Sequence, residues 1–175
     1  MSKSVLISIQ PKWCEKIFNG EKSIEVRKSR PKLETPFKCY IYCTKPKYEH
    51  EDFIRTDYPK PQFYGGGKVI GEFVCDRAFQ IDVLDNGSIR NWNYEHMERS
   101  CLSYEDVSVY IGREKRGYGW HISNLKIYNS PKKLDEFTGL RETRFGMEPV
   151  GIKRPPQSWC YVEGEDAKEN VCGEG

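Results

Sequence analysis

The segment KSIEVRK, residues 22–28, carries ionisable side chains at a spacing that suits the recognition of a polar ligand. Its alternation of polar and β-branched residues predicts a strand with the aliphatic side chains on one face and Glu25 and Arg27 on the other. If the aliphatic face packs on the core, Glu25 and Arg27 share a solvent or cleft face about 7 Å apart. Lys22 enters this strand just after a glycine turn.

These three side chains have the chemistry needed to bind a nucleic-acid base. A carboxylate accepts a hydrogen bond from the exocyclic amine of a base, and an arginine binds phosphate or carbonyl oxygens. A partly desolvated lysine can have a lowered pKa and act as a base or nucleophile. The alternative is a solvated strand face with weak cross-strand ion pairs, and the pattern alone leaves both interpretations open.

Aromatic residues close to basic or small polar residues are the second set of ligand candidates. They are Trp13 next to Lys12, Tyr118 and Trp120 after a basic run, and Trp159 next to Ser158. A base stacked on an aromatic ring gains about 1–3 kcal/mol, which suits single-stranded or flipped bases. Trp120 and Trp159 could equally be barrel core, because strand aromatics often are. Trp13 lies at the margin of its helix's apolar face, which makes it the stronger candidate.

Other reactive side chains carry weaker signals. His121 could be a general base or a structural histidine, and Ser158 could donate a hydrogen bond to a ligand. The seven cysteines show no compact framework spacing, which indicates reduced thiols. Cys39 and Cys43 would lie about 13 Å apart on a strand, too far to share one zinc ion. We therefore expect no metal and no cofactor.

Length and composition predict one folded domain. A chain of 175 residues can build one hydrophobic core, and 31% charged and 13% aromatic residues exclude a low-complexity chain. No apolar run is long enough to span a membrane, and the first residues lack a secretory signal. We expect a cytoplasmic protein that does not bind membranes; the sequence does not indicate its oligomeric state.

The net charge of +2 is unevenly distributed. Residues 164–175 hold four acids and one base, which predicts an acidic, disordered tail and leaves +5 on the body at 1–163. This mild excess favours an anionic partner but is far below that of a general nucleic-acid binder. A ligand of one or a few nucleotides fits better than a long duplex.

Hydrophobic patterns predict a mainly β protein of the α+β class. Strands are expected at Ser4–Ile9, 22–28, 37–43, 68–79, around 120–128 up to a break at Pro131, and at 155–163. Separated strands with few helices favour a small barrel or open roll.

Two helices are expected with recognisable ends. Pro11 starts the first, whose buried face is Cys14, Ile17 and Phe18 and which stops at Gly20. Ser103 and Asp106 form a cap signature for the second, with Val107, Tyr110 and Ile111 on one face and Gly112 at its end. Residues 90–102 could form a further helix, and residues 134–137 one helical turn.

Residues 44–67 differ from the rest of the chain. They are rich in proline, glycine and tyrosine and lack sustained periodicity, which indicates a lid, binding loop or insertion. The glycines at 65–67 do not form a phosphate loop, because no GK[ST] follows them.

The stretch SIQPKWCEKIFNGEKSIEVRKSRP, residues 8–31, resembles the N-terminal signature of the ASCH family. The segments YGWHISNLKIY and PPQSWCYVE are similar to that family's closing segments. The resemblance implies a PUA-like β-barrel of about five to seven strands with two or three flanking helices, related to PUA, EVE and YTH domains. It also implies that Lys22, Glu25 and Arg27 lie at a cleft.

Three functions follow from the resemblance and the residues. The first is a module that binds RNA or a modified nucleoside in a basic, aromatic-lined cleft. The second is an ASCH-type hydrolase, an N4-acetylcytidine amidohydrolase or ribonuclease, with Lys22 and Glu25, Glu72 or Asp76 as catalytic groups. Glu25 stands where the amidohydrolase pattern has a threonine, and a carboxylate cannot replace that hydroxyl nucleophile. The third is a protein-interaction or regulatory domain. We expect the first of these functions.

Overall fold

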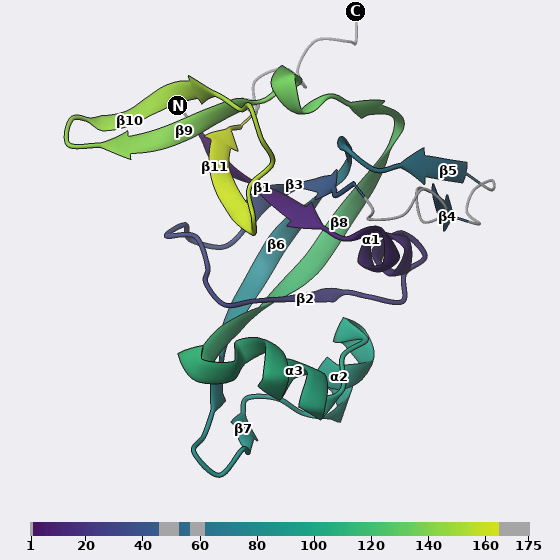
Figure 1. Cartoon of the computed structure of the whole chain (residues 1–175), viewed down its shortest axis with the longest axis vertical. Helices are drawn as coiled ribbons and strands as arrows, with labels where there is room; N and C mark the ends of the chain where they lie inside the picture. The colour runs from purple at the N-terminus through teal and green to yellow at the C-terminus, as the bar shows by residue number, and fades with distance from the viewer. Residues whose placement is uncertain (1, 46–52, 57–61, 165–175) are drawn as a thin grey trace, which may run out of the picture.

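A mixed nine-stranded sheet dominates the computed structural model, which describes residues 2–45, 53–56 and 62–164 (Figure 1). Its strands are β1 (Lys3–Ile9), β2 (Ile24–Arg27), β3 (Phe37–Cys43), β6 (Lys68–Val83), β7 (Ile89–Arg90), β8 (Arg116–Lys132), β9 (Thr138–Thr143), β10 (Gly146–Gly151) and β11 (Trp159–Glu163). They follow the order β10-β9-β11-β1-β3-β6-β8-β2, with β7 paired to β6. Only β1 and β3 among these pairs run parallel.

Three α-helices occur in the described residues: α1 (Pro11–Phe18), α2 (Tyr94–Ser100) and α3 (Tyr104–Ile111). Short 3-10 turns follow at Gly112–Glu114 and Leu134–Glu136. The mainly β, α+β class and the helix count agree with the sequence-based prediction. None of these helices has the length and hydrophobicity needed to cross a bilayer.

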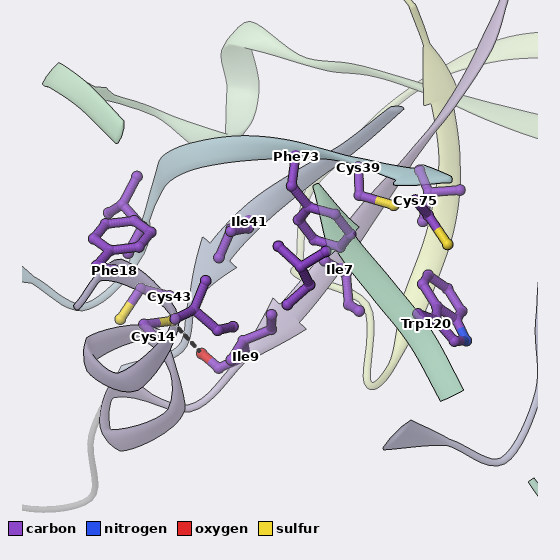
Figure 2. Close-up of a cluster of buried hydrophobic side chains, with 14 of the residues drawn as sticks. Ile7, Ile9, Cys14, Phe18, Cys39, Ile41, Cys43, Phe73, Cys75 and Trp120 are labelled. Carbon is purple, nitrogen blue, oxygen red and sulfur yellow. Dashed lines mark hydrogen bonds between the residues drawn. The ribbon is translucent and has the colours of Figure 1, made fainter. Parts of the chain in front are cut away.

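The central strand β1 is buried on both faces. Its residues Val5, Ile7 and Ile9 belong to the larger core, which α1 covers with Cys14, Ile17 and Phe18 as predicted (Figure 2). Leu6 points the other way, into a second cluster with tyrosines of β3 and β8. A strand buried on both faces has few polar residues, which explains the apolar run SVLISI.

Helices α2 and α3 cover a third apolar cluster at the end of the sheet near β2 (Figure 1). The predicted cap of α3 is confirmed: Ser103 and Asp106 bond each other's backbone N–H groups, and Gly112 ends the helix. The ambiguous stretch 90–102 contains α2, whose N-terminus is capped by Asn93 and His96. The predicted helical turn at 134–137 is the 3-10 turn Leu134–Glu136.

The predicted number of five to seven strands is too low, and no closed barrel is seen among the described residues. The sheet has nine strands, and no ladder among the described residues joins its ends, β10 and β2. The additional hairpin β9–β10 has no sequence signal, because glycines and Pro149 interrupt its alternation. It projects from one end of the molecule (Figure 1).

The predicted break at Pro131 is also wrong, since β8 continues to Lys132. The ladder with β6 is irregular there, and proline is tolerated at such irregularities because no ladder hydrogen bond is lost. Within the stretch 44–67, the described part contains a separate hairpin of β4 (Phe53–Thr56) and β5 (Gln62–Gly65) beside α1 (Figure 1). Residues 46–52, 57–61 and the predicted tail after Gly164 lie outside the described residues.

Gly71 of β6 occupies a place that only glycine fits. A Cβ atom there would lie 2.7 Å from the backbone oxygen of Lys126 and 3.2 Å from the ring of Phe18. We expect Gly71→Ala to lower the free energy of unfolding by about 1–3 kcal/mol, because backbone cannot move aside cheaply. Urea denaturation checks this, with Gly151→Ala as the matched control, because nothing lies within 4 Å of that position. Equal urea midpoints for the two variants would contradict the close packing of Gly71 against Lys126 and Phe18.

Candidate ligand pocket

A tight turn after α1 places Lys22 at the start of β2. The helix ends at Asn19, and Gly20 adopts a positive φ of 78° that L-residues rarely accept. The backbone N–H groups of Glu21 and Lys22 then donate to the carbonyl oxygen of Lys16 at 2.9 and 3.1 Å. The chain is thereby turned directly into β2.

Strand β2 separates its aliphatic and charged side chains as its pattern predicts. It pairs antiparallel with β8, and Ile24 and Val26 pack into the third cluster under α3. Glu25 and Arg27 therefore lie on the opposite face. The alternative of a solvated face is wrong, because Lys22, Glu25 and Arg27 are only 3, 6 and 8% exposed.

The three charged side chains form a buried ionic triad with Glu25 in the middle. Arg27 Nε donates to Glu25 Oε1 at 3.0 Å, and Arg27 Nη2 forms an ion pair with the same oxygen at 2.9 Å. Lys22 Nζ lies 3.4 Å from Glu25 Oε2 and donates to the carbonyl oxygen of Ser100 at 2.6 Å. The triad carries one net positive charge, which in a buried place favours an anionic or hydrogen-bond-accepting ligand.

Arg27 also joins parts of the sheet that no backbone ladder connects. Its Nη2 donates to the carbonyl oxygen of Ser8 on β1 at 2.8 Å. Its Nη1 donates to Ser158, to Oγ at 3.3 Å and to the carbonyl oxygen at 3.4 Å. Strand β2, at the end of the sheet, is thus tied to β1 and to the segment before β11.

A pocket of about 510 Å³ opens over the triad. This size lies within the range typical of small-molecule sites. Its walls come from β1, α1, β2, the residue after β3, the α2–α3 connection, α3 and the segment before β11: Ser8, Gln10, Trp13, Lys22, Glu25, Val26, Arg27, Thr44, Leu102, Tyr110, Pro155, Pro156 and Gln157.

One polar atom of the pocket has no hydrogen bond. Glu25 Oε2 is buried and, apart from the ionic contact with Lys22, has no hydrogen-bond partner among the described residues. A buried carboxylate oxygen left in this way costs free energy, and a ligand N–H would satisfy it. Glu25 and Lys22 both line the pocket, so an acceptor and a donor lie side by side at its base.

Two aromatic side chains line the pocket. The ring of Trp13 lies 5.0 Å from Lys22 Nζ and 4.7 Å from Lys12 Nζ, so that it is flanked by cations. Tyr110 is 41% exposed, yet burial of its hydroxyl end raises the pKa of that group, which keeps it a neutral donor. Both aromatic residues thus border the space that a ligand would occupy.

The structure brings together six of the sequence-predicted residues. Lys22, Glu25, Arg27 and Trp13 line the pocket, Lys12 contacts the Trp13 ring, and Ser158 holds Arg27.

Three predicted aromatic residues lie outside the pocket lining. Trp120 is completely buried in the larger core (Figure 2). Trp159 packs beside it, with ring centroids 6.2 Å apart, and donates to Ser29 Oγ. Tyr118 packs against the larger core and lines a different groove, formed by the residue after β2, by β7, by the start of β8 and by the end of β6.

The predicted acids on β6 also lie away from Lys22. Glu72 accepts a hydrogen bond from Tyr128 at 2.5 Å and pairs with Lys38 at 3.3 Å, near the second cluster. Gly71 contacts Phe18 of α1, so alternation along the strand turns Glu72 to the other face. Asp76 pairs with His121 at 2.6 Å, and neither residue lines the pocket.

Sequence reasoning did not identify Thr44, Leu102, Tyr110 and the segment Pro155–Gln157 as pocket residues. The pattern of α3 places Tyr110 on the same face as Val107 and Ile111. Those two residues are buried, whereas Tyr110 lies at the margin of the face and is partly exposed. The others lie in connections, where no periodic pattern marks a facing side chain.

The described residues contain no group of three histidine, cysteine or acidic side chains that could hold a metal ion. Cys39 and Cys43 are buried free thiols on β3 (Figure 2). Burial raises the pKa of Cys14 and Cys39 well above the usual range, which keeps these thiols protonated.

Comparison with known proteins identifies the fold. No protein-family model matches the chain, and no curated protein matches it. Solved structures of ZmASCH from Zymomonas mobilis do match. A serine-to-alanine variant aligns with a TM-score of 0.59 at 20% identity, over 91% of this chain and 88% of that one. The unmodified protein aligns with a TM-score of 0.52 at 17% identity, over 91% and 87%. The ASCH resemblance is thus confirmed at the level of fold.

Proposed function

Since the chain has the ASCH fold, we propose that the pocket over Lys22, Glu25 and Arg27 binds a base of single-stranded RNA or a modified nucleoside. The observation that carries this proposal is the unsatisfied Glu25 Oε2 beside the Lys22 ammonium group at the base of the pocket. The hydrogen-bonding edge of a base presents N–H donors next to carbonyl or ring-nitrogen acceptors. Such an edge complements this pair of groups.

The rest of the pocket supports the same ligand class. Trp13 lies over the ammonium group of Lys22, so a base that reaches the triad passes along an aromatic face. The net positive charge of the triad favours a nucleotide over an uncharged nucleoside. Glu25 and Arg27 are fixed by each other and by the sheet, so little order has to be gained on binding.

Binding without turnover is the form of the proposal that the contacts favour. The threonine-dependent amidohydrolase considered above would need a hydroxyl nucleophile activated by a neighbouring base. Ser8 Oγ instead donates to the carbonyl oxygen of Pro156 at 2.6 Å, and Glu72 lies on the other face of its strand. We expect no product when the purified chain is incubated with N4-acetylcytidine or small RNAs. Product formation that Lys22→Met abolishes would favour the hydrolase.

Truncation of Trp13 tests the aromatic wall. We expect Trp13→Ala to weaken the binding of nucleoside monophosphates by about 5- to 150-fold, because stacking of one base contributes about 1–3 kcal/mol. Isothermal titration calorimetry measures the affinity. Tyr94→Ala is the matched control, since Tyr94 is an exposed aromatic residue of α2 outside the pocket lining.

The outcome of this comparison is informative in both directions. Unchanged affinity in Trp13→Ala would mean that no base stacks there, and the proposal would fail. An equal loss in Tyr94→Ala would place the ligand on the helical surface instead. Indole N–H signals in an NMR titration give a second readout, in which the Trp13 signal is expected to move most.

A further inference from the structure

A second, basic groove lies next to the proposed base pocket. It has a volume of about 590 Å³, and its polar lining consists of Lys28, Asp82, Arg90, Lys115, Arg116 and Tyr118. Four cations and one carboxylate thus surround this space. The groove draws on the residue after β2, on β7, on the start of β8 and on the end of β6, which meet at one end of the sheet.

Two of the four cations already have acidic partners. Arg116 Nε lies 3.4 Å from Asp82, and Lys115 pairs with Asp85. Lys28 and Arg90 make no ion pair with any described carboxylate. Their positive charge is therefore available to an anion in the groove.

The groove and the base pocket come close to each other where Lys28, which lines the groove, lies over Tyr110, which lines the pocket. Arg27 lines the pocket, and the next residue, Lys28, lines the groove. Tyr118 is the cross-strand partner of Arg27 on β8. The Lys28 ammonium group lies 5.5 Å from the ring of Tyr110, which forms the pocket wall. A chain leaving the pocket past Tyr110 would thus enter the groove at Lys28.

We propose that this groove binds the phosphate backbone of the nucleotides adjacent to the one whose base enters the pocket. The ligand is then a short single-stranded RNA segment rather than a free nucleoside. This inference rests on the proposed function and extends it. Lys28 and Arg90 contact phosphates. A duplex fits poorly, because a base in the pocket must leave its pair.

The test compares ligands of increasing length with the full chain. Binding of mixed-sequence oligoribonucleotides of one, two, four and six nucleotides is measured by fluorescence anisotropy at several salt concentrations. The groove variant is Lys28→Gln with Arg90→Gln. The matched control is Lys126→Gln with Arg144→Gln, which removes one exposed lysine and one exposed arginine outside both sites.

We expect affinity to rise from one to about four nucleotides and then to level off. In the groove variant this gain disappears, and the slope of log affinity against log salt falls by about 1.4, since each phosphate contact on a single strand contributes about 0.7. The groove variant keeps the affinity of the wild-type chain for mononucleotides. The control variant keeps both the rise of affinity with length and the salt slope of the wild-type chain.

Failure of this inference differs from failure of the proposed function. The groove assignment alone is overturned if mononucleotides bind but affinity does not rise with the length of the oligonucleotide. It is also overturned if the two double variants show the same affinities and the same salt dependence. Length-dependent binding that Trp13→Ala leaves unchanged overturns the base pocket while the groove stands. Stronger binding of an acidic peptide such as oligoglutamate than of RNA assigns the groove to a protein partner and overturns the inference.

Discussion

Replacing Glu25 by alanine is expected to lower the free energy of unfolding by about 3–5 kcal/mol, the usual cost of removing one partner from a buried ion pair. The carboxylate lies between two cations that are almost completely buried, at 2.9 Å from Arg27 and 3.4 Å from Lys22. Without it the two positive charges repel each other in a poorly hydrated place. Urea denaturation followed by tryptophan fluorescence measures the change.

Two further variants make this result specific. Glu142→Ala removes an exposed carboxylate from β9 and is expected to change stability by less than about 0.5 kcal/mol. The triple variant Lys22→Met, Glu25→Leu and Arg27→Met replaces the triad by apolar groups and is expected to restore most of the lost stability while binding no nucleotide. If Glu25→Ala were as stable as Glu142→Ala, the triad would not be the buried network described here.

Replacing Lys22 by methionine is expected to weaken nucleotide binding by about 10- to 150-fold, because hydrogen bonds to charged groups contribute about 1.5–3 kcal/mol. Methionine retains much of the apolar stem but donates no hydrogen bond. Glu25 keeps its two contacts with Arg27, so the loss of stability is expected to be smaller than in Glu25→Ala. Calorimetric titration with nucleoside monophosphates measures the affinity.

Lys16→Met is the matched control for this substitution. Lys16 is a more exposed lysine of α1 whose ionic partner, Glu21, lies outside the pocket lining. Unchanged affinity is expected there, and equal affinity in the two lysine variants would show that Lys22 does not contact the ligand. Arg27→Ala is a poorer test, because Arg27 also holds β2 to Ser8 and Ser158, so that any loss of binding would include a structural effect.

The sequence predicted which face of β2 carries the charges, but not how those charges meet. Alternation alone separates Glu25 and Arg27 from the aliphatic residues, and the structure confirms that separation. Side-chain rotamers then bring Arg27 Nη2 to 2.9 Å from Glu25 Oε1, although same-face positions on a strand lie about 7 Å apart. The contact with Ser100 comes from a helix 78 positions further along the chain, which no local pattern indicates.

Irregular pairing limited the rest of the prediction. The ladder between β6 and β8 shifts register at three points, so the face on which Glu72 lies could not be deduced from alternation near its strand start. Trp120 is an aromatic residue of the kind that stacks on bases. It pairs with Glu25 across the β2–β8 ladder, and its side chain is buried in the larger core cluster. The residues Pro155–Gln157 form a pocket wall through the tertiary packing of a connection. A connection has no side-chain periodicity, so the sequence could not predict this wall.

The most direct test of the pocket is a crystal structure of the full chain soaked with a mixture of nucleoside monophosphates. We expect density for a base within hydrogen-bond distance of Lys22 Nζ and Glu25 Oε2, with its ring against Trp13. Density for a nucleotide elsewhere on the protein, with this pocket holding only water, would contradict it.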